Sequence, residues 1–182
     1  KYGWNKQRNL KLHNLQSAEA LSFVSDELRK PNISVDAFDF LADVVKACEF
    51  NDAALVSFFT GVVADRSRPL RQRHDASYVL QSAKLAEQDF ATLKSLLPLT
   101  EADDDIFSTI RGAILRVCWP AHLNETEIEG LSSRPFTNSY GSYEAFFGAL
   151  PDELVKRGNP ELALPWLRWV NERLADDAVH HD

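Results

Sequence analysis

Apolar residues recur along most of this chain at the spacing of an α-helix. Two series that show it are Leu21, Val24, Leu28 and Leu41, Val44, Val45, Cys48. Positions three and four apart share one helical face, so each series predicts a helix with one side turned to a core. The chain has only 7 glycines and no Asn-Gly or Asp-Gly pair, so hairpin turns between strands are not indicated. The pattern predicts an all-α fold.

Capping residues and prolines predict the ends of eight or nine helices. Ser, Asp and Asn side chains accept hydrogen bonds from the first turn of a helix, and proline is well tolerated in that turn. An acidic run favours a helix start, and Asn124 with Glu127 has the spacing of a capping box. The predicted helices cover about 18–30, 35–48, a third from Asn51 or Asp52 to 62, 69–84, 87–97, 103–118, a short segment from 124, 142–150 and 160–174.

The predicted helices fall into pairs of roughly 35 residues. A small residue recurs in the second helix of successive pairs, as Ala42, Ala76 and Ala113, which are 34 and 37 positions apart. Small side chains let helices approach closely, and stacked pairs share a continuous core. We therefore expect irregular HEAT-like helical repeats, a superhelix of helix pairs, over residues 14–176. A single irregular helical bundle is the alternative.

The two ends differ from this pattern. Residues 1–13, KYGWNKQRNLKLH, contain four basic residues and no acidic one. We interpret them as a connector from an upstream domain, with a basic arm that binds nucleic acid as the alternative. Residues 177–182 are expected to form a frayed C-terminal tail. The chain begins at Lys1 without an initiator methionine, which fits a processed protein or a piece of a larger one.

Charge, cysteines and hydropathy narrow the class of protein. The formal net charge of -7 argues against non-specific binding of nucleic acid, which needs a basic surface. The only two cysteines, Cys48 and Cys118, lie far apart in apolar helical patterns, as expected for reduced thiols in the cytoplasm. No apolar run approaches the roughly 20 residues that span a bilayer. We therefore expect a cytoplasmic protein without a membrane partner.

The sequence marks no residue as catalytic, cofactor-binding or metal-binding. The glycines form neither type of phosphate-binding loop, and no Gly-x-Ser-x-Gly sequence occurs. His74 and Asp75 are adjacent on a predicted helix, where neighbouring side chains point about 100° apart and cannot pair as base and orienting acid. Asp75 follows Arg71 by four positions, which predicts an ion pair between them. The acidic run 103–105 is interpreted as surface charge that suits a helix start. His122 is interpreted as a side chain that caps backbone groups.

Four arginines gather around Pro69 at a predicted helix start: Arg66, Arg68, Arg71 and Arg73. Positive charge there opposes the helix dipole, so another group should compensate it. One hypothesis is pairing with Asp65, Asp75 and acids of neighbouring helix turns. The other is a contact surface for an acidic or phosphorylated protein partner.

Part of the C-terminal half resembles a known family. Residues 111–131 read RGAILRVCWPAHLNETEIEGL, followed by a loop with Pro135, by YGSYEAFF at 140–147 and by LPWLRW at 164–169. This stretch resembles a helical segment downstream of the NACHT-type ATPase module in large bacterial signal-transduction ATPases with numerous domains. The residues that match its pattern are Arg111, Gly112, Leu115, Arg116, Trp119, Pro120, His122 and Leu123. Ile114 and Cys118 depart from it.

The resemblance covers about one third of the chain and implies a part of a multidomain ATPase, with its nucleotide site elsewhere. It brings no catalytic residue to this segment. We expect a non-catalytic sensor or scaffold that recognises a protein, a ligand or neighbouring domains of its parent protein. Trp119, Trp166 and Trp169 are expected to anchor the core. The alternatives are a small HEAT-like nucleic-acid glycosylase and an independent dimerisation module.

Overall fold

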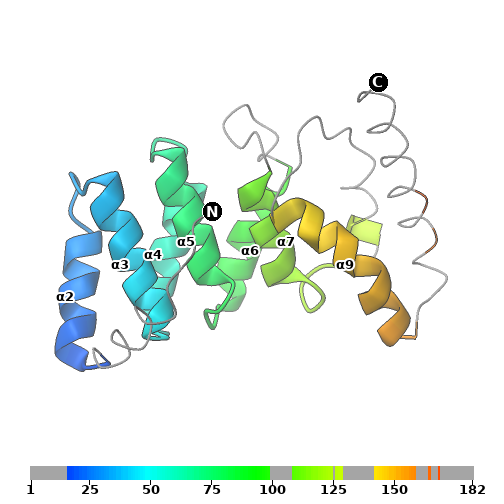
Figure 1. The fold of residues 1–182 in the computed structure, drawn as a ribbon, viewed down its shortest axis with the longest axis horizontal. Helices are drawn as coiled ribbons and strands as arrows, with labels where there is room; N and C mark the ends of the chain where they lie inside the picture. Colours follow the sequence, from blue (N-terminus) through cyan, green and yellow to red (C-terminus); the bar gives the residue numbers. More distant parts are fainter. Residues whose placement is uncertain are drawn as a thin grey trace, which may run out of the picture. The chain divides into compact units, whose positions relative to one another are not determined.

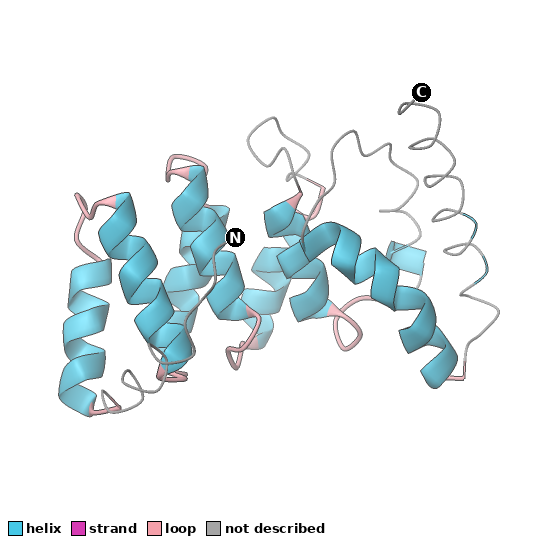
Figure 2. Ribbon diagram, in the orientation of Figure 1, coloured by secondary structure: helices cyan, strands magenta, loops and turns pink. Residues whose placement is uncertain are grey.

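The computed structural model describes residues 16–98, 108–124, 126–128 and 142–158, together with Leu164 and Arg168. Within these ranges the regular secondary structure is helical, without strands (Figure 2), so the predicted all-α class is confirmed. The chain divides into two compact units, Lys1–Thr100 and Glu101–Asp182. The expected connector 1–13, the tail 177–182, Trp166 and Trp169 lie outside the described residues.

Five helices make up the described part of the first unit. They are α2 (Ala18–Leu28), α3 (Val35–Ala47), α4 (Ala53–Ala64), α5 (Leu70–Leu80) and α6 (Glu87–Leu96). Successive helices run in opposite directions (Figure 1). Ser17, Ser34 and Asp52 cap the first three, and each side chain accepts a hydrogen bond from the backbone N–H three residues later, at 3.1, 3.2 and 3.0 Å. These local bonds explain why the predicted helix starts are confirmed.

The helices of the first unit stack as pairs. Helix α3 contacts α5, and α4 contacts both α5 and α6, so alternate helices lie against each other. The capping position Asp52 follows Ser17 by 35 residues, and the start of α6 at Glu87 follows that of α4 at Ala53 by 34. A repeated unit that contacts only its neighbours is typical of helical-repeat arrays. The spacing agrees with pairs of roughly 35 residues, and the HEAT-like type stays a prediction.

Side-chain hydrogen bonds join positions about one helix pair apart. Ser57 Oγ on α4 donates to Asp89 Oδ1 on α6 at 3.2 Å, and Asp89 also accepts from the Ala86 N–H at 3.1 Å. Asn51 Oδ1 accepts from the Lys84 N–H at 3.0 Å. These pairs are 32 and 33 residues apart in the sequence. They hold the turn before α6 in register with the start of α4.

Helix α4 is the most apolar element of this unit and carries no charged residue. Leu55, Phe59 and Val63 are fully or almost fully buried. Phe59 also packs edge-on against Phe38 of α3, with ring centroids 6.1 Å apart. A helix that is apolar over most of its circumference needs neighbours on several sides. The packing of α5 and α6 against α4 meets that need.

The second unit is built on contact between α7 (Thr109–Cys118) and α9 (Ser142–Lys156). Residues 126–128 are also helical, and the predicted capping box at Asn124 and Glu127 is confirmed. The Asn124 N–H donates to Glu127 Oε2, and the Glu127 N–H donates to Asn124 Oδ1, each at 2.9 Å. Tyr143 and Phe147 of α9 are fully buried and in ring contact, with centroids 4.6 Å apart.

Gly112 marks the closest approach of α7 and α9. A Cβ atom added at this position would overlap backbone atoms of Ser142 and Tyr143. Ala113, the next residue, is buried, as are Ala42 on α3 and Ala76 on α5. The recurring alanines are therefore buried in both units, and the close approach of two helices is shown at Gly112.

Three predicted helix ends are wrong. Helix α5 ends at Leu80 rather than near 84, with Pro69 at its capping position. Helix α7 begins at Thr109, after Ser108 in a left-handed conformation, so the acidic run 103–105 does not open it and lies outside the described residues. Helix α9 continues through Pro151 to Lys156, because the buried face of Phe147 and Leu150 extends to Leu154 at helical spacing.

We expect Gly112→Ala to lower the free energy of unfolding by about 1–3 kcal/mol or more, because the methyl group would force two helix backbones apart. The urea midpoint followed by circular dichroism measures this change. Gly148→Ala is the matched control, since Gly148 lies in α9 with nothing within 4 Å of an added Cβ. The control should be neutral or stabilising by up to about 1 kcal/mol. Equal effects of the two substitutions would contradict this account of the packing.

Candidate functional site

Arg71 of the predicted arginine cluster binds acids of another helix. Its Nη2 lies 2.7 Å from Asp39 Oδ2, and its Nη1 lies 3.8 Å from Asp36 Oδ1, both on α3. The predicted ion pair with Asp75 is not the one that forms, although Arg71 still acts on that carboxylate electrostatically. Helix stacking places α3 close to Arg71, which spacing within a single helix could not reveal.

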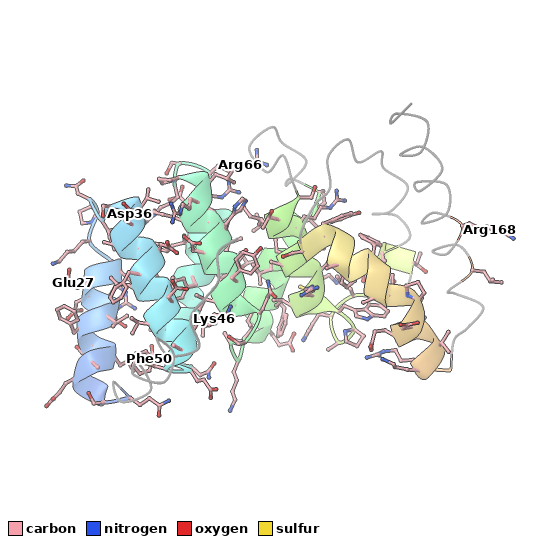
Figure 3. The ribbon with its side chains drawn as sticks, viewed as in Figure 1. Glu27, Asp36, Lys46, Phe50, Arg66 and Arg168 are labelled. Carbon is pink, nitrogen blue, oxygen red and sulfur yellow. The ribbon has the colours of Figure 1, made fainter. Side chains whose placement is uncertain are left out.

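The other three arginines occupy different environments. Arg73 is only 3% exposed, and its Nε donates to the Val63 carbonyl at 3.1 Å. Arg68 is partly buried, with its Nε 3.8 Å from Asp65 Oδ2. Arg66 is exposed (Figure 3). Pairing with Asp65 and with acids of a neighbouring helix therefore accounts for Arg68 and Arg71, and Arg73 joins α5 to the end of α4. A contact between Arg66 and a partner stays a prediction.

Asp36 and Asp39, the acids that pair with Arg71, belong to a surface formed by α3 and α5. We define the α3–α5 face as the exposed or partly exposed residues Asp36, Asp39, Phe40, Asp43 and Lys46 of α3 with Arg71, His74, Asp75 and Tyr78 of α5. Within each helix every one of these residues lies three or four positions from another of the set, which keeps them on one side. Asp36 lies near the start of α3 and Lys46 near its end (Figure 3), a span of about 15 Å along the helix.

Asp75 is the most strongly perturbed group of the α3–α5 face. Burial is the main cause that raises the pKa of its carboxyl group to about 6. The negative charge of Asp39 raises it further, as does that of Asp43, whereas Arg71 and His74 oppose the shift. Asp75 Oδ2 is shielded from solvent and has no hydrogen-bond partner among the described residues. Three carboxylates from two helices are therefore crowded along the line where α3 meets α5.

Two aromatic side chains add apolar surface to this face. Phe40 on α3 is 60% exposed, and Tyr78 on α5 is 37% exposed. The Lys46 ammonium lies 5.9 Å from the centroid of the Tyr78 ring, a cation–π distance. The face can therefore offer both negative charge and apolar contact. Sequence reasoning did not single out Asp39, Asp43 or Phe40. The acidic and aromatic residues that recur on the outer side of α3 form the sequence pattern that could have indicated them.

The remaining residues considered in the sequence do not form a second site in the described regions. His74 belongs to the α3–α5 face, and His122 is partly buried in the turn after α7. Cys48 and Cys118 are buried and form no disulfide with each other, and burial raises the pKa of the Cys48 thiol. Within the described part of the chain, no three His, Cys, Asp or Glu side chains are placed to hold a metal ion.

The residues that carry the family resemblance have packing roles where the structure describes them. Arg111 is fully buried, with its guanidinium carbon 5.5 Å from the centroid of the Tyr143 ring. Gly112 permits the approach of α9, and Leu115 is fully buried. Trp119 is half-buried rather than deep in the core, and Arg157 lies 5.5 Å from its ring centroid. The described part of the motif therefore joins α7 to α9.

No model of a known protein family matches this chain, and neither curated proteins nor solved structures yield a match. The relation to NACHT-type ATPases therefore stays a hypothesis drawn from the sequence. Among the described helices, none combines the length and apolar character needed to cross a bilayer.

We expect Asp75→Asn to stabilise the protein by about 1 kcal/mol near neutral pH, after allowance for solvent screening of this partly exposed group. A pKa raised to about 6 in the folded state means that folding disfavours the ionised carboxylate. The cost is absent below the ordinary pKa of about 4 and is complete once pH rises above about 6. The gain should therefore shrink as pH falls from 8 toward about 4, as measured by urea unfolding at several pH values.

Asp26→Asn is the control for this experiment. Asp26 is exposed on α2, and its substitution removes the same charge from a chain of net charge -7. If both substitutions stabilise equally and with the same dependence on pH, general charge repulsion rather than crowding at Asp75 explains the result.

Proposed function

We propose that this chain is a non-catalytic recognition or scaffold segment of a larger protein, and that the α3–α5 face is the surface at which it contacts a protein partner. The helix pairs act as a HEAT-like frame in this proposal. The parent protein is a bacterial, cytoplasmic ATPase of the NACHT type with its nucleotide site outside this chain. In such a protein a helical segment can bias two states only through contacts that differ between them.

The exposed Phe40 carries this proposal. A side chain of this size that is 60% exposed on a regular helix leaves apolar area in water, and its neighbours on the α3–α5 face are charged. Aromatic residues are enriched where proteins bind each other, because they bury a large area with little loss of conformational entropy. Asp75 is a second argument for this surface, since ionisable groups with a shifted pKa occur preferentially at functional sites.

No observation favours the alternatives of a nucleic-acid glycosylase or an independent dimerisation module. A nucleic-acid enzyme needs a basic surface to hold phosphates, whereas the α3–α5 face has four aspartates against one lysine and one arginine. The four arginines that could have formed a basic surface are separated. Arg73 is buried, Arg68 and Arg71 form ion pairs, and Arg66 is exposed.

Photo-crosslinking in cells that express the parent protein tests the recognition surface. A benzophenone amino acid in place of Phe40 should form a covalent adduct with one defined protein, or with another domain of the same polypeptide. Phe23 is the matched control, because it is 61% exposed on α2, a neighbouring helix, but outside the α3–α5 face. We expect no such adduct from position 23.

Two results would oppose the proposal. Equal yields of adduct from both positions would indicate non-specific contact. The absence of an adduct from position 40 would contradict the recognition role of the face. The proposal that the parent protein is a NACHT-type ATPase is tested separately, by the full open reading frame that encodes this chain. A phosphate-binding loop of the ATPase type upstream supports it, and a frame that encodes these residues without such a module refutes it.

A further inference from the structure

Three positions of α5 face the helix pair that precedes it in the chain. Arg71 Nη2 lies 2.7 Å from Asp39 Oδ2 of α3. Gln72 is only 2% exposed, and its Nε2 lies 3.5 Å from the Ile33 carbonyl oxygen in the turn before α3. Asp75 is partly buried and lies in the electrostatic field of Asp39. Positions 71, 72 and 75 therefore mark the side of α5 that stacks on the pair of α2 and α3.

The corresponding positions of α3 are open to solvent. Helices α2 and α3 form one end of the first unit (Figure 1). Pro69, the capping position of α5, follows Ser34, the capping position of α3, by 35 residues. Positions 71, 72 and 75 of α5 thus correspond to Asp36, Ala37 and Phe40 of α3. All three are exposed, and Phe40 is 60% exposed. Helix α3 therefore presents to solvent the side on which α5 receives its neighbour.

This side of α3 carries a row of apolar residues that is distinct from its core side. We define the open row of α3 as Ala37, Phe40, Val44 and Ala47. Each member lies one position before a residue of a buried series, which consists of Phe38, Leu41, Val45 and Cys48. One position turns a helix by about 100°, so the two rows point in different directions. The spacing of three, four and three positions is that of the seam along which two helices pack. The partner that fits the open row is therefore another helix with apolar residues at the same spacing.

The exposed aromatic residue of α2 does not point to a neighbour in the same way. Phe23 corresponds to Phe58 of α4, since their capping positions Ser17 and Asp52 are also 35 residues apart. Phe58 is still partly exposed although a helix pair precedes it, and the Arg29 guanidinium carbon lies 5.8 Å from its ring centroid. Stacking of helix pairs does not bury this position. The evidence for a further neighbour is therefore confined to α3.

We infer that a further helix of the parent polypeptide, placed before α2 in the chain, stacks on the open row of α3 as α3 stacks on α5. Its apolar residues, three and four positions apart, cover Ala37 and Phe40. Each unit of a helical-repeat array contacts its neighbours in the same chain, and α3 comes before α5. The helix that continues the stack beyond α3 therefore comes earlier still. The inference rests on the proposed recognition function and identifies the partner of Phe40 as part of the same protein.

Thiol labelling of the parent protein and of the full 182-residue chain tests the inference. Ala37→Cys places an exposed thiol in the open row and keeps Phe40, whereas the native Cys48 and Cys118 are buried. Mass spectrometry follows the labelling of the peptide that contains position 37. Labelling should be at least about tenfold slower in the parent protein, because the stacked helix must first open. Ala91→Cys is the matched control, since Ala91 is an exposed alanine within α6, and its labelling rates in the two proteins should agree within about twofold.

A second pair of variants tests whether Phe40 holds the helix in place. In the parent protein that carries Ala37→Cys, Phe40→Ala should speed labelling at position 37 at least about fivefold, because it removes the largest exposed side chain of the open row. Phe23→Ala is the control and should change the rate by less than about twofold. Equal labelling of position 37 in the parent protein and the 182-residue chain would overturn the inference, as would equal effects of the two phenylalanine substitutions.

Photo-crosslinking from position 40 separates this inference from the function on which it rests. An adduct that maps to a helix encoded before α2 in the same polypeptide supports both. An adduct with a different protein would overturn the inference and leave the recognition function standing. Absence of any adduct from position 40 would contradict the recognition function itself.

Discussion

The burial of helix α4 is the constraint on which the first unit depends. This helix has no charged side chain, and its large residues point in several directions, so a single neighbour could not cover it. Helices α5 and α6 pack against it, and α3 reaches it through the contact of Phe38 with Phe59. Its two polar side chains are also satisfied, since Thr60 donates to the Val56 carbonyl at 3.1 Å and Ser57 donates to Asp89. Of the charged residues of α5, Arg73 donates to the Val63 carbonyl of α4, whereas Arg71 and Asp75 interact with acids of α3.

This arrangement explains why charge gathers where α3 meets α5. Two stacked helices that each turn their polar side outward bring acids from positions 32 to 36 residues apart into one another's field. Arg71 neutralises one end of the resulting row, whereas Asp75 remains crowded by Asp39 and Asp43. A crowded, partly buried carboxylate costs folding free energy. Its presence beside an exposed aromatic ring is understandable if the surface serves binding rather than stability.

The second unit depends on a different constraint, the close approach of two helix backbones. Gly112 leaves no room for a side chain against Ser142 and Tyr143, and Arg111 next to it is fully buried against the Tyr143 ring. These residues belong to the stretch that resembles the ATPase-associated segment. Since packing explains the residues of the motif that lie between α7 and α9, the motif reports how a helix pair is built. It does not by itself indicate what the pair binds.

The sequence alone determined the helical class and most helix starts, because caps such as Ser17, Ser34 and Asp52 act on backbone groups within one turn. It also indicated the length of the helix pair and the buried alanines. It could not indicate that α9 continues through Pro151, because the buried face that includes Leu154 forms only against other elements. Nor could it place Arg71 against Asp39 or crowd Asp75 between two helices. Those contacts join residues about one helix pair apart, and only the stacking of helices in three dimensions brings them within electrostatic range.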